Sequence, residues 1–249
     1  MKPLFAMMLL LFSGFLPVNV SAGGGDVVLV PADIQLDDRE AIKRGAKLFV
    51  DYCLNCHSAA LMRYSRIAQD LGMSNDEVSS QLITTDAKVG EMMKVAMTAE
   101  DAKRWFGMAM PDLSVIARAR GVDWLYTYLR SFYRDDSRPW GVNNAVFKDV
   151  GMPHVLWELQ GLQVPIIESH TDEQGNTSEV IRGFTLVEEG LLNSAEYDAV
   201  VRDLVTFLAY LGEPSKLQRL ALGKWVLLFL AGLLVLTLLL KKEYWRDIR

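Results

Sequence analysis

The chain has 249 residues, 51% of them hydrophobic, and its formal net charge at pH 7 is −5. This acidic balance disfavours nucleic-acid binding, because the phosphate backbone attracts basic proteins. About 200 residues lie between its two hydrophobic ends, which is enough for one domain with a substantial core.

The N-terminus predicts a secretory signal peptide over residues 1–22. Lys2 is its only charge, an apolar run follows from Leu4 to Phe15, and Val20-Ser21-Ala22 places small residues at the cleavage site. An uncleaved anchor is the alternative. The run is short for a membrane span, and the Gly23–Gly25 stretch that follows is a poor helix former, so cleavage after Ala22 is favoured.

The first predicted helix of the exported part covers residues 37–52. Carboxylates at its start suit a helix N-terminus, and apolar residues recur at helical spacing at Ile42, Phe49 and Tyr52. Gly45 inside this helix is costly unless another backbone approaches closely there. We therefore expect a close contact at Gly45.

The residues Cys53-Leu54-Asn55-Cys56-His57 form a Cys-x-x-Cys-His motif, the attachment signal for c-type haem. Two thiols at this spacing can each bond to one vinyl group of a porphyrin, and the adjacent histidine supplies the proximal ligand of the iron. A thioredoxin-like pair would sit at a helix N-terminus, whereas these cysteines follow a helix. A zinc site would need further ligands nearby, but His154 and His170 lie far downstream.

The motif therefore predicts one covalent haem c, bound by Cys53 and Cys56 with His57 as proximal ligand. A methionine as sixth ligand stabilises reduced iron and raises the reduction potential. Two methionines, Met110 and Met152, precede a proline, which suits an extended loop that holds a thioether toward a metal. His154 is a rival that would give a low-potential bis-histidine haem. Composition and spacing do not choose between the two methionines.

Two further elements are predicted before the C-terminal hydrophobic run. Residues 164–169 and 180–186 alternate enough for a β-hairpin with its turn over residues 173–176, an insertion whose role the sequence does not reveal. A helix over 195–211 has an apolar face and a capping residue at Asn193 or Ser194. A helix before the haem motif that crosses a late helix is the basic arrangement of cytochromes c with one haem.

The run from Leu220 to Leu240 contains a single charge, Lys224, near one edge. A helix of this length spans a hydrocarbon core of about 30 Å, and because the run is apolar on all faces it is a poor candidate for a buried core helix. The basic residues Lys241, Lys242, Arg246 and Arg249 follow it, so the tail is expected to stay in the cytoplasm.

The central domain is expected to be strongly acidic. Without the signal, the membrane span and the tail, 20 basic and 29 acidic residues remain, a charge near −9. Such a surface attracts a basic partner and speeds encounter, although solubility alone would also account for it.

Four further stretches, in register with the haem motif, resemble the cytochrome c1 family. Met110–Arg120 looks like its Pro-Pro-Asp-Leu-Ser…Arg-Ala-Arg segment. Asn143–Phe147 followed by Gly151–Leu156 resembles the bacterial members, and Phe207–Pro214 before a single span resembles the last helix and anchor. The resemblance covers essentially the whole chain after the signal.

The resemblance implies roles for four residues. Met152 matches the family's axial methionine and would be the distal ligand. Met110 matches a position that is usually proline, so it is expected to be a packing residue beside the haem. Arg120 matches an arginine near a haem propionate, and Trp124 replaces a tyrosine that often contacts the same group.

The resemblance also implies the architecture. It indicates a mainly α fold, a class I cytochrome c-like haem domain with loop and β-hairpin insertions, plus one C-terminal transmembrane helix. The divisions are a signal peptide at 1–22, a periplasmic haem domain at 23–219, an anchor at 220–240 and a cytoplasmic tail at 241–249. The expected location is the bacterial inner membrane.

The implied function is electron transfer within a bc1 complex, from a Rieske iron–sulfur protein through the haem to a soluble or anchored cytochrome c. Cytochrome b is the implied membrane neighbour, the complex is expected to be dimeric, and the subunit alone is not expected to be an enzyme. Two alternatives remain. One is an anchored cytochrome that serves another respiratory complex, such as a terminal oxidase; the other is a haem sensor or enzyme with a labile sixth ligand.

Overall fold

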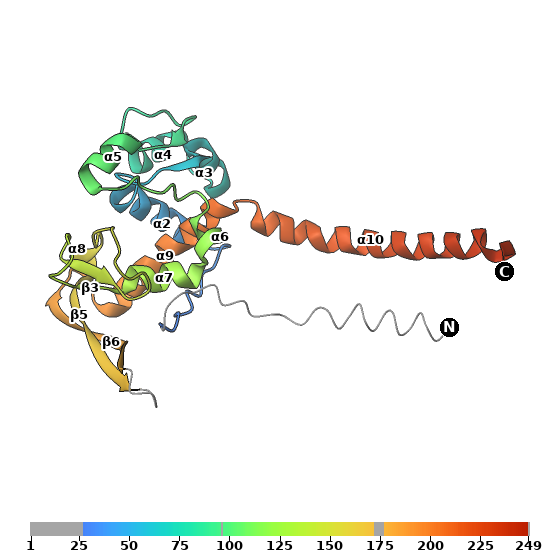
Figure 1. The fold of residues 1–249 in the computed structure, drawn as a ribbon. Helices are drawn as coiled ribbons and strands as arrows, with labels where there is room; N and C mark the ends of the chain where they lie inside the picture. The colour runs from blue at the N-terminus through green and yellow to red at the C-terminus, as the bar shows by residue number, and fades with distance from the viewer. Residues whose placement is uncertain (1–26, 96, 172–176, 249) are drawn as a thin grey trace.

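The computed structural model describes residues 27–95, 97–171 and 177–248, so the expected signal peptide at 1–22 lies outside the described residues. A domain of helices and small hairpins carries one long helix that extends away from it (Figure 1). The elements in chain order are α2 (Arg39–Tyr52), β1 (Ala59–Arg63), α3 (Tyr64–Leu71), α4 (Asn75–Leu82), β2 (Met92–Met93), α5 (Ala99–Phe106), α6 (Ile116–Arg120), α7 (Val122–Arg130), β3 (Phe132–Arg134), β4 (Val142–Asn144), α8 (Trp157–Gln160), β5 (Gly161–Thr171), β6 (Thr177–Glu189), α9 (Ser194–Gly212), α10 (Lys216–Tyr244) and a final 3₁₀ turn (Arg246–Ile248).

Helices α2 and α9 cross in the core, as the sequence predicts. Asp38 caps α2 by accepting a hydrogen bond from the backbone of Ala41. A Cβ at Gly45 would overlap the carbonyl oxygen of Asp203 and lie 2.7 Å from the Cβ of Phe207, both on α9. The glycine is therefore required by the close backbone approach.

Helix α9 begins with a capping box in which Asn193 and Glu196 each bond to the other's backbone N–H. Of the two capping residues considered from the sequence, Asn193 is the one used. The face of α9 toward α2 and α7 is buried and includes Val201, Leu204 and Phe207. This helix is the scaffold on which the other elements of the core pack.

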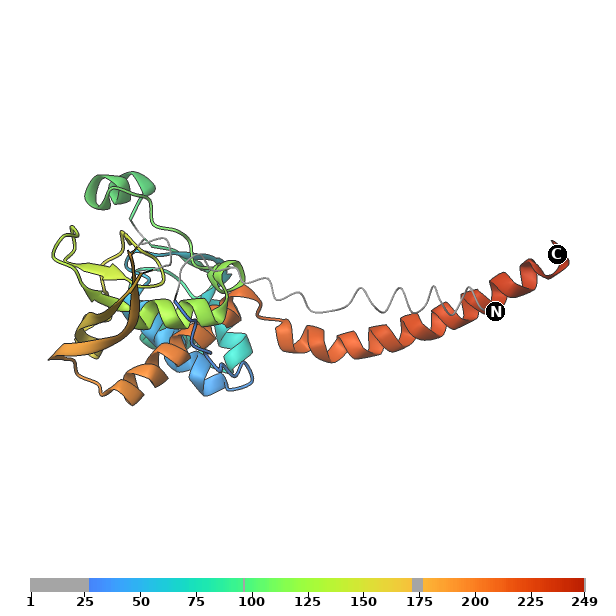
Figure 2. The ribbon, with the colours of Figure 1, turned by 60° about the horizontal axis from the view of Figure 1, so that its bottom comes forward.

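The predicted hairpin is confirmed and is longer than expected. Strands β5 and β6 pair antiparallel from Gly161 with Glu189 to Thr171 with Thr177, while the predicted turn over 173–176 lies outside the described residues. The hairpin packs on β3, where the rings of Tyr133 and Phe184 stack 6.3 Å apart. Helix α5 stands off at another edge of the domain (Figure 2).

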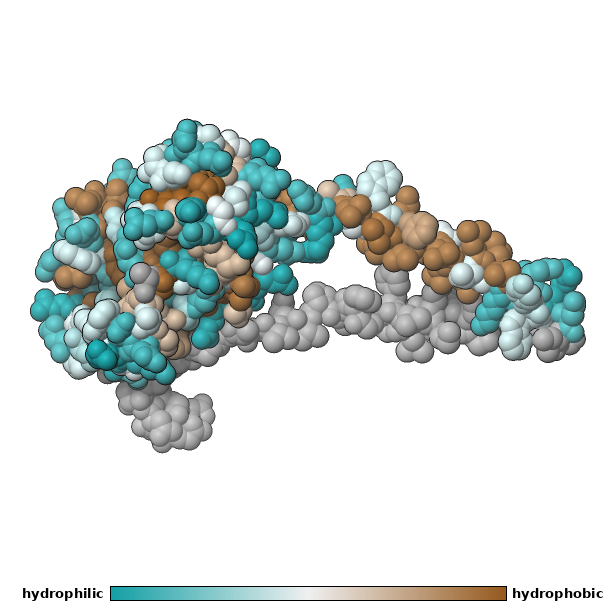
Figure 3. Space-filling model, turned by 90° about the horizontal axis from the view of Figure 1, so that it is seen from above, coloured by the Kyte–Doolittle hydropathy of each residue, from teal (hydrophilic) through white to brown (hydrophobic). Residues whose placement is uncertain are grey.

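Helix α10 has no buried residue, and in the described part of the chain it is the one helix long and apolar enough to cross a membrane. Apolar residues cover most of this helix, and hydrophilic residues appear at its far end (Figure 3). Only Glu213-Pro214-Ser215 separates α10 from α9. Within this connector the Glu213 carboxylate forms ion pairs with Arg118 of α6 and Arg219 of α10.

Candidate haem-binding site

The end of α2 presents the Cys-x-x-Cys-His motif. Cys53 is the C-cap residue of α2, and the backbone N–H of His57 donates to the Cys53 carbonyl at 2.8 Å, which folds the motif into a tight turn. Burial raises the pKa of the Cys53 thiol to about 12. A helix C-terminus also disfavours negative charge, so the structure does not favour a reactive thiolate pair.

The orientation of His57 is fixed by the loop before α6. Its Nδ1 lies 2.8 Å from the carbonyl oxygen of Pro111. A carbonyl oxygen only accepts hydrogen bonds, so Nδ1 carries the proton and Nε2 keeps a lone pair for a ligand. Metal-binding histidines are commonly oriented by such a contact.

The same loop is attached to the chain that follows the motif. The N–H of Leu113 donates to the Ser58 carbonyl, and the carboxylate of Asp112 accepts from the N–H groups of Ala60 and Ser114, each at 2.8 Å. Burial raises the pKa of Asp112, but the hydrogen bonds from Ser114 and Ala60 outweigh it, so the net pKa is lowered. The Pro111 carbonyl is thereby held against His57.

A predominantly apolar cavity of about 300 Å³ opens beside the motif. The site residues predicted from the sequence all line it: Cys53, Cys56, His57, Arg120 and Met152. Leu204 and Leu208 of α9 and Leu125 and Tyr128 of α7 contribute to its walls. The cavity thus brings together residues more than 150 positions apart in the chain, from Cys53 to Leu208.

The wall that carries Met152 is a loop held by two buried asparagines. The Oδ1 of Asn144 accepts from the backbone of Val146 and Phe147, and its Nδ2 donates to the Tyr128 carbonyl at 2.7 Å. Asn143 uses its Oδ1 to accept from the backbone of Asp149 at 2.9 Å. These bonds replace secondary structure in fixing the loop.

Within the described part of the chain, one polar group bonds to the sulfur of Met152. The hydroxyl of Tyr128 donates to Met152 Sδ at 3.4 Å. Met110 also lines the cavity, so location alone does not distinguish the two methionines. The role of Met152 as distal ligand stays a prediction, as do those of the two cysteines and His57.

His154, considered as a rival ligand, is not among the residues that line the cavity. Its ring is buried and stacks on Phe132 with the centroids 4.9 Å apart and the planes within 2°. Burial lowers its pKa to about 4, so the imidazole is neutral at pH 7. The structure therefore gives no support to a bis-histidine site.

Arg120 and Trp124 lie together at the cavity. The guanidinium carbon of Arg120 is 5.1 Å from the Trp124 ring centroid and 5.8 Å from that of Phe147. No carboxylate among residues 27–95, 97–171 and 177–248 forms an ion pair with Arg120. A cation that stacks on aromatic rings beside an apolar cavity suits a carboxylate-bearing ligand such as a haem propionate.

Sequence reasoning missed Tyr128 and the α9 residues Leu204 and Leu208. Tyr128 follows Trp124 by four positions on α7, so helical spacing could have placed both on one face. The leucines belong to an apolar stripe that the sequence identified only as core.

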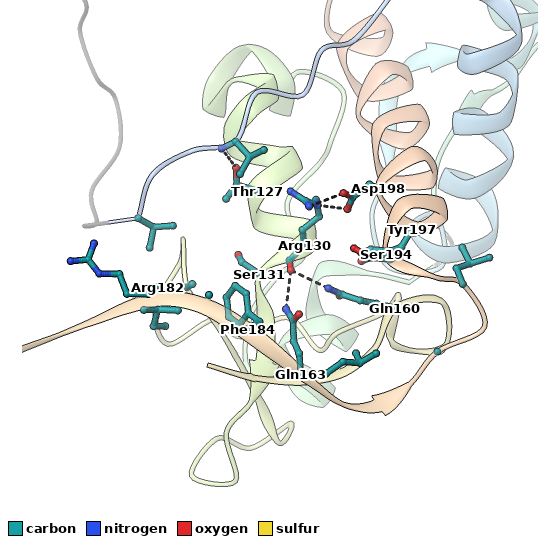
Figure 4. Close-up of a pocket in the computed structure, with 18 of the residues that line it drawn as sticks. Thr127, Arg130, Ser131, Gln160, Gln163, Arg182, Phe184, Ser194, Tyr197 and Asp198 are labelled. Carbon is teal, nitrogen blue, oxygen red and sulfur yellow. Dashed lines mark hydrogen bonds and ion pairs between the residues drawn. The ribbon is translucent and has the colours of Figure 1, made fainter. Parts of the chain in front are cut away.

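A second hollow, of about 830 Å³, lies between residues 27–30, the end of α7, the hairpin and the start of α9 (Figure 4). None of the predicted site residues lines it. The Arg130–Asp198 ion pair spans α7 and α9, and the side chains of Gln160 and Gln163 both donate to the Arg130 carbonyl. These contacts join the hairpin base to the helical core.

The residues at the first cavity fit a haem. Paired thiols, an imidazole whose Nδ1 is already engaged, a thioether, apolar walls and a guanidinium at the rim match the donor set that such a group needs. The motif, the crossed helices and this cavity together define a haem protein of the cytochrome c class.

Comparison with known sequences narrows this class. The sequence model of the cytochrome c1 family matches residues 34–161. A cytochrome c1 from Allochromatium vinosum is 49% identical over 93% of this chain and 94% of its own length. A protein from Nitrosomonas europaea named ammonia monooxygenase gamma subunit is 50% identical over the same shares. A cytochrome b/c1 from Bradyrhizobium diazoefficiens is 27% identical over 84% of this chain and 34% of that longer protein.

The chain belongs to the cytochrome c1 family, the haem-containing electron-transfer subunits of bc1 complexes.

Proposed function

We propose that this chain carries one haem c, attached through Cys53 and Cys56 and ligated by His57 and Met152, and that it passes electrons from a Rieske iron–sulfur protein to a cytochrome c. The observation that carries the proposal is the convergence of all four residues on one apolar cavity. The hydrogen bond between His57 and Pro111 supports the proximal assignment.

The haem supplies one-electron chemistry, and the chain supplies its position and surroundings. The thiols fix the group to the end of α2, and the leucines of α7 and α9 keep water away. Arg120 compensates a propionate at the rim. The chain alone makes and breaks no substrate bonds; quinol oxidation belongs to the whole complex.

The proposed setting is a bc1 complex in the bacterial inner membrane, where α10 packs near cytochrome b and the haem domain faces the periplasm. Support comes from the apolar length of α10 and from the basic residues Lys241 and Lys242 in its last turn. The acidic haem domain suits a basic electron acceptor. Removal of residues 1–22 on export and a dimeric complex are parts of the same proposal.

Affinity purification in mild detergent tests this proposal. We expect mass spectrometry to find one haem bound to Cys53 and Cys56, and to identify cytochrome b and a Rieske protein in the same preparation. The reduced protein should not bind carbon monoxide at neutral pH, because its sixth site is filled. Free thiols would contradict the haem site, whereas subunits of a monooxygenase or a terminal oxidase in place of cytochrome b would contradict the setting.

A further inference from the structure

The hydroxyl of Tyr128 points at the sulfur of Met152. The two atoms are 3.4 Å apart, and the described residues offer this hydroxyl no other acceptor. Both side chains line the haem cavity, and a phenol carries its proton at neutral pH, so Tyr128 can donate. A partly buried hydroxyl among apolar side chains needs an acceptor, and the thioether is the one it has.

The surroundings fix the direction of this hydroxyl. The Tyr128 ring stacks on Trp124 with centroids 4.9 Å apart and planes within 10°, and Phe132 packs edge-on at 5.1 Å. Asn144, which holds the loop of Met152, also binds the backbone carbonyl of Tyr128. The donor and the loop that carries the acceptor are therefore positioned together.

A thioether sulfur has two lone pairs, so one can bind a metal while the other accepts a hydrogen bond. Donation from an O–H group withdraws electron density from the sulfur. This weakens the bond of the sulfur to oxidised iron more than its bond to reduced iron, so the reduced form is favoured. We propose that Tyr128 is a positioning residue that orients Met152 and raises the reduction potential of the haem. This inference rests on the proposed function, in which Met152 is the distal ligand.

The variant Tyr128→Phe tests the inference, because it keeps the ring and removes only the hydroxyl. We expect covalent haem and the methionine–iron charge-transfer band of the oxidised protein to remain. The midpoint potential should fall by less than 59 mV. For one electron this is a less than tenfold shift of the redox equilibrium toward the oxidised form. Tyr197→Phe is the matched control, because it removes a buried hydroxyl that donates to the Leu129 carbonyl. Tyr197 does not line the cavity, so this variant should leave the potential unchanged.

A double-mutant cycle shows whether the effect passes through the sulfur. In a Met152→Leu background, Tyr128→Phe should produce no further change in potential. An equal shift in both backgrounds would contradict a route through Met152, and an equal shift in Tyr197→Phe would reduce the effect to a general loss of packing.

A wrong ligand assignment and a wrong inference about Tyr128 would give different results. If the natural protein lacks the charge-transfer band and Met152→Leu leaves its potential unchanged, the ligand assignment is wrong and the inference falls with it. If both ligand tests succeed while Tyr128→Phe has the natural potential, only the inference is wrong. Should Tyr128→Phe not accumulate, the iron–sulfur stretching vibration of the natural protein provides the test: we expect it to shift in deuterium oxide, and an unchanged frequency would overturn the inference.

Discussion

Two walls of the haem cavity are built by different means. The motif wall, residues 53–57, directly follows the regular helix α2. Main-chain hydrogen bonds hold this helix, and its crossing with α9 sets its position. The methionine wall, residues 142–155, has only the short strand β4 and is held by side chains, chiefly Asn143 and Asn144. A helix distributes its support over many equivalent bonds, whereas such a loop depends on a few particular ones.

The largest expected effect comes from the motif wall. In the variant Cys53→Ala plus Cys56→Ala the haem loses its covalent bonds, and the cavity walls lose the group that fills them. We expect apoprotein that is degraded in cells, measured as loss of haem-stained and immunodetected protein. A stable, folded domain without haem would show that the core does not depend on the group.

At the methionine wall, Met152→Leu should leave the haem covalently attached and lower its reduction potential. The expected shift is on the order of 0.08 V, a tenth of the range of about 0.8 V over which axial ligands set haem potentials. The vacated position should also admit carbon monoxide to the reduced protein. Met110→Leu is the matched control and should do neither, as redox titration and difference spectra would show. Exchanged results would mean that the distal ligand is Met110.

The support of the motif wall can be tested at Gly45. A methyl group in Gly45→Ala would overlap backbone of α9, which cannot move aside, so we expect the free energy of unfolding to fall by about 3 kcal/mol. Gly90→Ala is the control, since nothing lies within 4 Å of a Cβ there. Denaturant unfolding of the haem-loaded protein measures the free energy of unfolding of each variant. If Gly45→Ala is as stable as Gly90→Ala, the helix crossing is not rigid.

The support of the methionine wall can be tested at Asn144. Asn144→Ala leaves two loop N–H groups without partners and removes one of the donors to the Tyr128 carbonyl, which should cost on the order of 2 kcal/mol. The loss should be local: the methionine–iron band should weaken at lower denaturant than the global transition. Asn55→Ala, at an exposed residue of the motif wall, should change neither, and an intact band in Asn144→Ala would show that the loop does not depend on this residue.

The smallest effect concerns pH. Because the pKa of Asp112 is lower in the folded protein than its ordinary value of about 3.9, its carboxylate stabilises the fold above that value, and the stabilisation is lost as pH falls through the folded pKa. Asp112→Asn should therefore weaken the dependence of stability on pH below about 4. Unfolding midpoints between pH 2.5 and 6 measure this, with exposed Asp37→Asn as control; identical pH profiles for Asp112→Asn and the natural protein would contradict it.

The contrast between the walls explains how far sequence reasoning reaches. The motif wall follows from short-range patterns: helix spacing over 37–52, an acidic cap and five motif residues. The close contact at Gly45 followed from one costly residue type. The methionine wall could not be derived in this way, because Asn144 acts on a carbonyl sixteen residues away, and such pairings leave no periodicity.

The hairpin also shows which features short-range sequence patterns predict and which they do not. Alternation predicted that β5 and β6 exist, but their extent depends on long-range contacts such as the buried amide of Gln163, which donates to the Phe132 carbonyl at 2.7 Å. Likewise, resemblance to a family singled out Met152 and Arg120, whereas the partner of the sulfur, Tyr128, emerged only from the three-dimensional contacts.

The connector Glu213-Pro214-Ser215 has a mechanical consequence. With three residues, one of them proline, and with Glu213 joined to charged groups on both sides, the globular part has little freedom to swing on its stalk. In the proposed setting, with α10 in a membrane, this connector would hold the haem at a set height above the bilayer. The proposed electron donor and acceptor would then have to move to reach it.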